Sequence, residues 1–444
     1  MNNKTVAAEW VKSCLKKGAD AAEVYLVTGR NLRIQIRNGE IETVEEASTQ
    51  GVGFRVFIRG RMACAGSNDL SESALESAIN RAVEFAKITT ADENNILPDD
   101  RTSIEVQGLY DPQIAKIPLD TKIRLALQAE KLAMKDPRIT KSAGAGYGES
   151  EEEVVIANSL GILKSRRGTN CSFRVSVVAE KGDQKSSGGE YCGRRYFADL
   201  KSPEEVAAKA AREAYQMLDP KMVKTQKAAV IFDPDVARSL LGGILEAIHG
   251  ERVLQGASFL AKKLDQRIAS DLLTVTDDGT LPKGPASRPF DGEGVTTRKR
   301  LIIEKGILKG FLYNTAVARR AGVQSTGNAS RSGFADLPGI GSHNVYMAAG
   351  TMKPEEIIAD TRVGLWLKEV TGYGINPVNG QFSGGASGFW IENGKVVFPV
   401  KGLTIAGSAE EMFLGIDALG NDLDLNRGTS GPTFRIKLLQ IGGE

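Results

Sequence analysis

The residues with the clearest capacity for chemistry are two histidines, His249 and His343, in a chain of 444 residues. Two histidines exclude a three-histidine metal site within one chain. Glu246 lies three residues before His249, so on a helix the two side chains share a face. The dimetal carboxylate pattern needs a second Glu-x-x-His, and the chain has one copy. We favour a partly buried histidine at a helix end and leave a metal ligand open. His343 lies in an expected loop without a companion ligand.

A Gly-rich run near the C-terminal end is a second candidate. It holds Ser383, Gly384, Gly385 and Ser387. Its backbone amides could cradle an anion, but we favour a flexible turn that precedes a strand at residues 389–392. A nucleophile elbow, a P-loop and a dinucleotide-binding glycine motif after a strand are all absent from the sequence.

Paired carboxylates are a third candidate, at Asp277 and Asp278. Because Gly279 follows them and Asp-Gly is a common turn pair, we favour a turn. The residues alone therefore give no convincing catalytic constellation. The four cysteines contain no CxxC spacing and are typical of reduced cytosolic thiols: Cys14, Cys64, Cys171 and Cys192.

Composition excludes several classes of protein. Lys plus Arg number 57 and Asp plus Glu number 55, so a formal net charge of +2 gives no sign of a nucleic-acid or membrane-surface binder. Hydrophobic residues make up 41%, enough for real cores. We find no apolar stretch of membrane-spanning length and no secretory signal, and we expect a cytoplasmic protein.

The first half of the chain predicts two similar helix–meander–helix units. A helix is expected at residues 4–17, and a Gly-turn meander with an Asn38-Gly39 hairpin follows. The expected strands are 22–27, 31–37, 40–47, 51–58 and 61–65, and a helix over 71–88 completes the unit. The second unit has helices at 121–134 and 203–218 around strands at 154–158, 161–167 and 171–180.

The second half predicts a β-rich domain, so the fold class is α+β. A strand at 228–232 precedes a helical stretch over 234–265, interrupted near Gly242 and Gly243. The C-terminal part should be a barrel or sandwich with two hairpins, at 302–308 and 390–397, and with short helices at 315–321, 354–359 and 409–417. We place domain boundaries at 1–112, 113–222 and 223–444.

A series of short motifs, each weak alone, resembles the TldD/PmbA family in order along nearly the whole chain. The motifs lie at residues 19–24, 51–55, 258–260, 277–280, 290–294, 303–310, 325–328, 391–395, 399–402 and 420–423. The family is known as a cytoplasmic metallopeptidase of two related subunits. It was named for effects on DNA gyrase and is linked to trimming modified peptides and degrading an unfolded antitoxin.

The resemblance also implies where a metal site would lie. A TldD-type subunit carries HExxxH on a helix and a distal cysteine in Gly-Thr-Cys-Gly. The corresponding positions here hold Leu241 and Glu246 for the histidines, Gly242 for the glutamate and Ser430 for the cysteine. The resemblance thus implies a PmbA/TldE-type subunit with no metal and no catalytic residue of its own, and with zinc in a TldD-type partner.

On this interpretation the chain pairs with a TldD-type subunit in a heterodimer or larger assembly, or forms a homodimer when alone. It helps to enclose extended peptide substrates, with the Gly-rich run as a possible groove loop, and contacts neither nucleic acid nor membrane. Two alternatives stay open. The chain could be a peptidase on its own through an unrecognised site, or a non-enzymatic regulator that binds DNA gyrase or another protein.

Overall fold

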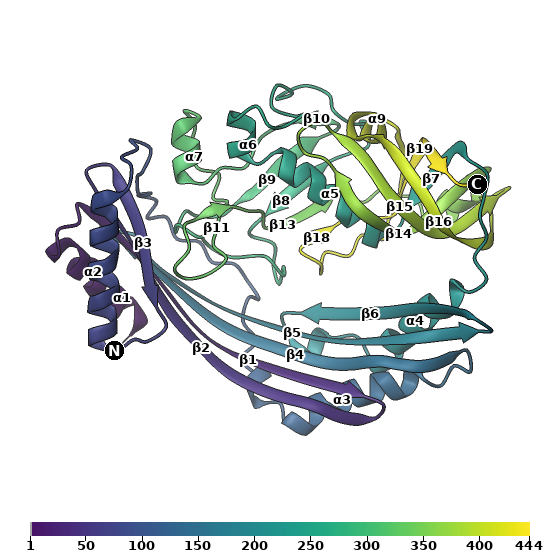
Figure 1. Cartoon of the computed structure of the whole chain (residues 1–444), viewed down its shortest axis with the longest axis horizontal. Coiled ribbons are helices and arrows are strands. Elements are labelled where there is room, and N and C mark those ends of the chain that lie inside the picture. The colour runs from purple at the N-terminus through teal and green to yellow at the C-terminus, as the bar shows by residue number, and fades with distance from the viewer. Residues whose placement is uncertain (1) are drawn as a thin grey trace.

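A computed structural model describes residues 2–444. The N-terminal half is built on one antiparallel sheet in the order β3-β2-β1-β4-β5-β6, curved into a half-barrel (Figure 1). Its strands are β1 (Ala21–Arg37), β2 (Glu40–Ile58), β3 (Arg61–Ser67), β4 (Ile139–Asn158), β5 (Leu163–Lys181) and β6 (Gln184–Arg194). Each pair of strands expected between 22 and 58 is one long strand, and both expected units share the sheet because β1 pairs with β4.

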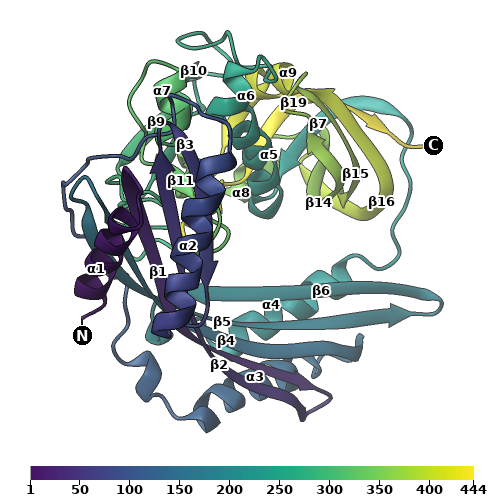
Figure 2. The ribbon, with the colours of Figure 1, turned by 60° about the vertical axis from the view of Figure 1, so that its left-hand side comes forward.

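Four helices cover one face of this sheet. They are α1 (Asn3–Lys16), α2 (Glu72–Ile88), α3 (Leu119–Ala133) and α4 (Pro203–Gln216), with 3-10 turns at Ile114–Lys116 and Phe197–Asp199. Alternate residues of β1 point to them: Val24 packs with α1 and α2, and Ile34 with α3 and α4. Figure 2 shows the two helix pairs at different ends of the sheet. The opposite, concave face is left open by the helices.

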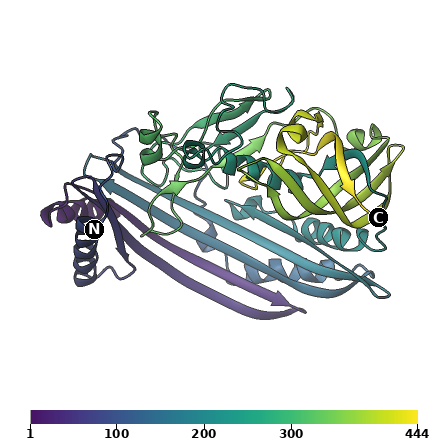
Figure 3. The ribbon, with the colours of Figure 1, turned by 45° about the horizontal axis from the view of Figure 1, so that its top comes forward.

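Of the barrel or sandwich expected in the C-terminal half, the structure has the barrel. Five strands, β16-β15-β14-β7-β19, close on themselves through a β16–β19 pairing, and β17 (Ile416–Leu419) extends β19. Their bounds are β7 (Gln226–Phe232), β14 (Val363–Ile375), β15 (Gln381–Glu392), β16 (Lys395–Ser408) and β19 (Phe434–Gly442). The α+β class is therefore confirmed. Figure 3 shows the long N-terminal strands running beneath this half.

A second sheet and several short helices complete the C-terminal half. The sheet has the order β10-β9-β8-β13-β18, and β11 pairs with β12. The strands are β8 (Val275–Asp278), β9 (Lys299–Glu304), β10 (Ile307–Leu308), β11 (Ala329–Ser330), β12 (Gly339–Ile340), β13 (Asn344–Met347) and β18 (Thr429–Ser430). Both predicted hairpins form, with Lys305-Gly306 and Asn393-Gly394 at the positive φ values that such turns need.

The predicted helical stretch over 234–265 is only partly correct. The helix α5 (Pro234–Ala247) runs through Gly242 and Gly243 without interruption, and α6 (Gly250–Leu254) is separate. Gly243 serves packing: a Cβ there would lie 2.6 Å from Cβ of Ile375 on β14. The three short helices form as α7 (Thr315–Arg320), α8 (Pro354–Ala359) and α9 (Ala409–Leu414). No helix within residues 2–444 is long and apolar enough to cross a membrane.

A buried ion cluster joins the two halves. Arg55 of β2 lies 2.8 Å from Glu23 of β1 and 2.9 Å from Glu293 of the C-terminal half. Arg331 of the C-terminal half also pairs with Glu23. Beside the cluster, the Phe334 segment packs onto two glycines of β2: a Cβ at Gly51 would meet the Phe334 ring, and one at Gly53 would lie 1.9 Å from its carbonyl oxygen.

Candidate functional site

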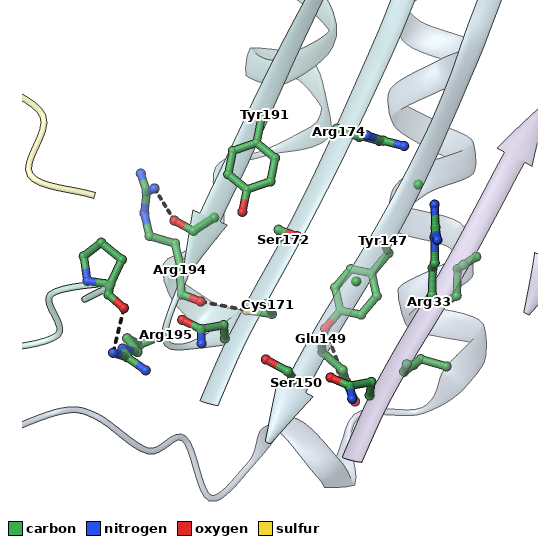
Figure 4. A pocket seen from close by; sticks show the side chains of 18 of the residues that line it. Arg33, Tyr147, Glu149, Ser150, Cys171, Ser172, Arg174, Tyr191, Arg194 and Arg195 are labelled. Carbon is green, nitrogen blue, oxygen red and sulfur yellow. Dashed lines mark hydrogen bonds between the residues drawn. The ribbon is translucent and has the colours of Figure 1, made fainter. Parts of the chain in front are cut away.

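The open concave face of the half-barrel borders a cavity of about 550 Å³ (Figure 4). Along β5, Cys171 and Phe173 are buried under the helices, whereas Ser172 and Arg174 face the cavity side. The C-terminal half closes the other side with residues that include Lys283 and Asn426. The cavity therefore lies between a rigid sheet floor and loops of the second half.

The floor alternates long polar side chains with glycines. Arg33 of β1 is opposite Gly148 of β4, which is opposite Ser172 of β5, which is opposite Gly193 of β6. Gly193 gives space to Tyr191, because a Cβ there would lie 2.6 Å from the tyrosine hydroxyl oxygen. The result is a shallow floor on which backbone atoms are accessible beside the arginine.

Arginines dominate the charge of this cavity. Arg195 is the deepest, at 7% exposed, and its guanidinium donates to the carbonyls of Gly284, Pro285 and Ser287 in the C-terminal half. Burial, with the nearby positive charge of Arg166, lowers the pKa of Arg195 to about 10, so it stays protonated at neutral pH. Within residues 2–444, no carboxylate lies within 4.0 Å of four guanidinium groups, those of Arg33, Arg174, Arg194 and Arg195.

The acidic residue that lines the same cavity is already neutralised. Glu149 points to the helix side, where its carboxylate lies 2.6 Å from Nζ of Lys122 and accepts a hydrogen bond from the Tyr147 hydroxyl. Lys283 is also paired, at 2.6 Å from Asp199. The excess positive charge therefore belongs to the arginines.

Two smaller cavities continue the groove. One of about 340 Å³ shares Asn170 and Arg195 with the first and adds Arg166, which is 2.9 Å from Glu152. The other, of about 390 Å³, begins two residues further along β5 at Ser176. Its charged lining is mostly acidic and comes from both halves: Glu213, Asp233, Asp235, Lys368 and Glu369.

The positions predicted for a degenerate metal site lie on α5 and β18, and the structure brings only some of them together. The turn after Ser430 packs on α5, because a Cβ at Gly431 would lie 3.8 Å from a terminal carbon of Leu241. Leu241 is buried, and the Ser430 hydroxyl is buried without a hydrogen-bond partner among the described residues. The space around the Cβ position of Gly242 is open.

Glu246 is separated from this group. Its carboxylate is exposed and lies 3.3 Å from Arg252. His249 caps the start of α6, with Nδ1 buried and unpartnered within residues 2–444, and burial lowers the pKa of its imidazole. The interpretation of His249 as a partly buried helix-end histidine agrees with this position.

The Gly-rich run is not a loop, so that prediction is wrong. Ser383, Gly384, Gly385 and Ser387 lie inside β15, paired with β14 and β16. The glycines are required by close neighbours: a Cβ at Gly385 would lie 2.5 Å from the Thr371 hydroxyl oxygen. Ser387 lines the acidic cavity.

The favoured turn at Asp277 and Asp278 is also wrong, since both end the buried strand β8. Asp277 is 1% exposed and lies 3.2 Å from Nδ1 of His343, while the amide of Asn328 donates to it at 2.7 Å. His343 thus has Asp277 as a partner, and the two are brought together by the pairing of β8 with β13. Burial of all three side chains gives them a structural role.

Sequence reasoning missed the arginine cavity. Arg33 and Arg174 alternate with buried apolar residues on β1 and β5, which is the available signal. That alternation predicts that both arginines lie on the solvent-facing side of their strands. It does not predict that β4, with its glycines, lies between those two strands.

Comparison with known proteins assigns this chain to a family. Models of the PmbA/TldA metallopeptidase domain 1, central domain and C-terminal domain match residues 22–86, 112–218 and 225–443. The fold and these matches define a two-part α+β protein of the metallopeptidase class. The chain belongs to the PmbA/TldD metallopeptidase family.

Individual relatives cover almost the whole chain. The metalloprotease PmbA of Escherichia coli O157:H7 is 33% identical, over 96% of this chain and 93% of its own. A TldD homologue of Buchnera aphidicola is 26% identical over 100% and 96%. The solved TldE of Thermococcus kodakarensis superposes with a TM-score of 0.91 at 25% identity, over 98% of this chain and 99% of its own. A Bacteroides thetaiotaomicron structure, whose name refers to modulation of DNA gyrase, has a TM-score of 0.92 at 28% identity, over 100% and 99%.

The family name implies a metal ion, but the residues at the positions that the resemblance assigns to its ligands do not fit one. Leu241 and Gly242 offer no ligand atom, Glu246 points to Arg252, and the hydroxyl of Ser430 stays protonated at neutral pH. Across residues 2–444, no three His, Cys, Asp or Glu side chains are grouped so that they could hold a metal.

Proposed function

We propose that this chain is the PmbA/TldE-type subunit of a TldD/TldE-like metalloprotease and lacks a metal site of its own. A TldD-type partner would supply the zinc and the general base. This chain would supply one wall of a chamber for unfolded or modified peptides and would bind them in an extended form. On this proposal it works in the cytoplasm.

The observation that carries the proposal is a contrast between two places in the molecule. At the α5–β18 contact, a buried leucine and a serine occupy positions where ligands would be required. The groove, in contrast, has a polar floor on which Gly148 and Gly193 leave room between the longer side chains, which suits an extended chain. A chain that keeps a groove and lacks ligands fits the role of a partner subunit.

The test has two measurements on the purified chain. Elemental analysis should find no stoichiometric zinc or iron, because the aligned positions hold no ligand set. The chain alone should not cleave an unfolded peptide, and cleavage should appear when a TldD-type subunit is added. A TldD-type subunit with its HExxxH glutamate changed to glutamine is the matched control, and the mixture should then be inactive.

Three results would contradict the proposal. One tightly bound transition metal per chain, lost in His249→Ala, would assign a metal site to this chain. Chelator-insensitive cleavage by the chain alone would support an independent peptidase. Failure to activate or bind a TldD-type subunit, together with direct binding to DNA gyrase, would support a regulator.

A further inference from the structure

We infer that the arginine cavity selects acidic segments of extended peptides, an inference that rests on the proposed function and assigns a substrate preference to its groove. The cavity is lined by five cationic side chains and by one carboxylate, Glu149. Glu149 is paired with Lys122 on the helix side, and Lys283 with Asp199. Arg195 donates to backbone carbonyls, so the charge available to a ligand is that of Arg33, Arg174 and Arg194.

The nearest other carboxylates do not neutralise the arginines. Glu45 is the cross-strand neighbour of Arg33, but the two do not form a salt bridge. The positive charge of Arg194 helps to lower the pKa of Asp424, but the two side chains do not form a salt bridge. Arg174 is exposed on the open face, with Gly146 as its partner on β4 and therefore with no side chain beside it there.

The arginines are spread over several strands, a spacing that suits the side chains of an extended peptide. Arg33, Arg174 and Arg194 lie on β1, β5 and β6, and neighbouring strands of a sheet are about 4.8 Å apart. With β4 between β1 and β5, the first two are therefore roughly 10 Å apart across the sheet. Alternate side chains of an extended peptide, spaced by about 7 Å, can contact successive arginines of this floor in turn.

The sign of the groove reverses, and this favours a peptide over a nucleic acid. Ser176, two residues after Arg174 on the same face of β5, already lines the cavity that contains Glu213, Asp233, Asp235 and Glu369. Asp233 pairs with Lys368 at 2.5 Å, Asp235 with Arg427 at 3.5 Å and Glu213 with Lys209 at 3.8 Å, but Lys368 is the one cation among the lining residues of this cavity, against four carboxylates. A uniformly charged phosphate backbone would meet repulsion there. A peptide with acidic residues at one end and an amino terminus or lysine at the other fits both parts.

The experiment measures binding by the full chain alone, by fluorescence anisotropy. The probes are unstructured labelled peptides of equal length that are acidic (Asp/Gly/Ser), neutral (Gly/Ser) or basic (Lys/Gly/Ser), and an oligothymidylate of the same charge as the acidic peptide. We expect the acidic peptide to bind about tenfold more tightly than the neutral one, with a loss of affinity as salt is raised.

The variant Arg33→Gln/Arg174→Gln should weaken acidic-peptide binding by about three- to tenfold and leave neutral-peptide binding unchanged. Both side chains are exposed, so the fold should be retained, as circular dichroism can verify. Arg320→Gln/Arg362→Gln removes the same charge from outside the three cavities and should have no effect. Arg174→Glu is a second test and should reverse the preference between acidic and basic peptides.

Equal affinity for acidic and neutral peptides, no binding of the acidic peptide, tighter binding of the oligonucleotide, or wild-type behaviour of the double variant would each overturn the inference. The proposed function is judged separately, by cleavage of a neutral peptide in a mixture with a TldD-type subunit. If the mixture cleaves peptides without a preference for acidic ones, the proposed function is supported and this inference is wrong. If the arginines are needed for binding but the chain activates no partner, this inference is supported and the proposed function is wrong.

Discussion

Single residues in this chain are specialised by what lies next to them, and the arginines show this most clearly. Arg195 donates to the carbonyl of Thr169 in the N-terminal half and to those of Gly284 and Pro285 in the C-terminal half, so its charge is fixed in place. Arg55 has the same side chain but is enclosed by Glu23 and Glu293, which raise the pKa of its guanidinium and leave no charge for a ligand. Identical residue types therefore join the two halves in different ways, through backbone carbonyls at one place and through carboxylates at the other.

Asp291 gives a prediction at this scale. Burial and the adjacent Glu293 raise the pKa of its carboxyl to about 7. The unfolded chain loses this proton near pH 4, so the native state holds the extra proton between roughly pH 4 and 7. The free energy of unfolding should fall as the pH rises through that window, by at most about 1.4 kcal/mol per pH unit from this group.

The check is the pH dependence of the melting temperature. Asp291→Asn should lose less stability than the wild type between pH 5 and pH 8, and Asp271→Asn, which changes an exposed carboxyl, should follow the wild type. A variant whose melting temperature falls in parallel with that of the wild type would show that Asp291 is ionised throughout.

At the scale of elements, α5 shows how two adjacent glycines can lie inside a helix for different reasons. The helix begins at Pro234 after its cap, Asp233, and buries Leu240, Leu241 and Ile244 in the C-terminal core. Adjacent glycines inside a helix cost stability because glycine loses more backbone freedom than alanine. Only one of the two has a neighbour that requires it.

The two glycines therefore predict opposite effects of the same substitution. Gly242→Ala places a methyl group in open space and should stabilise the chain by about 0.5–1 kcal/mol. Gly243→Ala places it 2.6 Å from Cβ of Ile375 and should destabilise by about 1–3 kcal/mol. Urea unfolding of both variants is the measurement. Equal effects of the two would mean that α5 does not pack on β14 through Gly243.

The elements also show what the sequence could predict. Turns such as Asn38-Gly39 and short helices such as α8 depend on a few adjacent residues, and these predictions are confirmed. The Gly-rich run of β15 was predicted as a turn because glycine is common in both turns and tightly packed strands. The arginine cavity depends on the pairing of β1 with β4, across more than a hundred residues, and no local pattern contains that register.

At the scale of the whole molecule, the two halves are fixed to each other by a buried junction at one end and meet again beside the cavity at Arg195 and Lys283. The fixed end contains the ion cluster, the Phe334 contact with β2, and an apolar group formed by Tyr25 and Ile156 with Phe290. The same concave face is apolar there and polar along the cavity. The geometry of the groove therefore depends on how firmly that end is joined.

Arg55 is the most sensitive point of that junction, and it gives the last prediction. Arg55→Met would leave Glu23 and Glu293 buried with fewer partners, and loss of one member of a buried ion pair typically costs about 3–5 kcal/mol. We expect a decrease of that size in urea unfolding. Arg30→Met removes a partly exposed pair with Glu46 on the same sheet and should change stability by less than about 1 kcal/mol. If both variants lose the same small amount, the cluster does not hold the halves together, and the apolar contact of Phe290 must carry the junction.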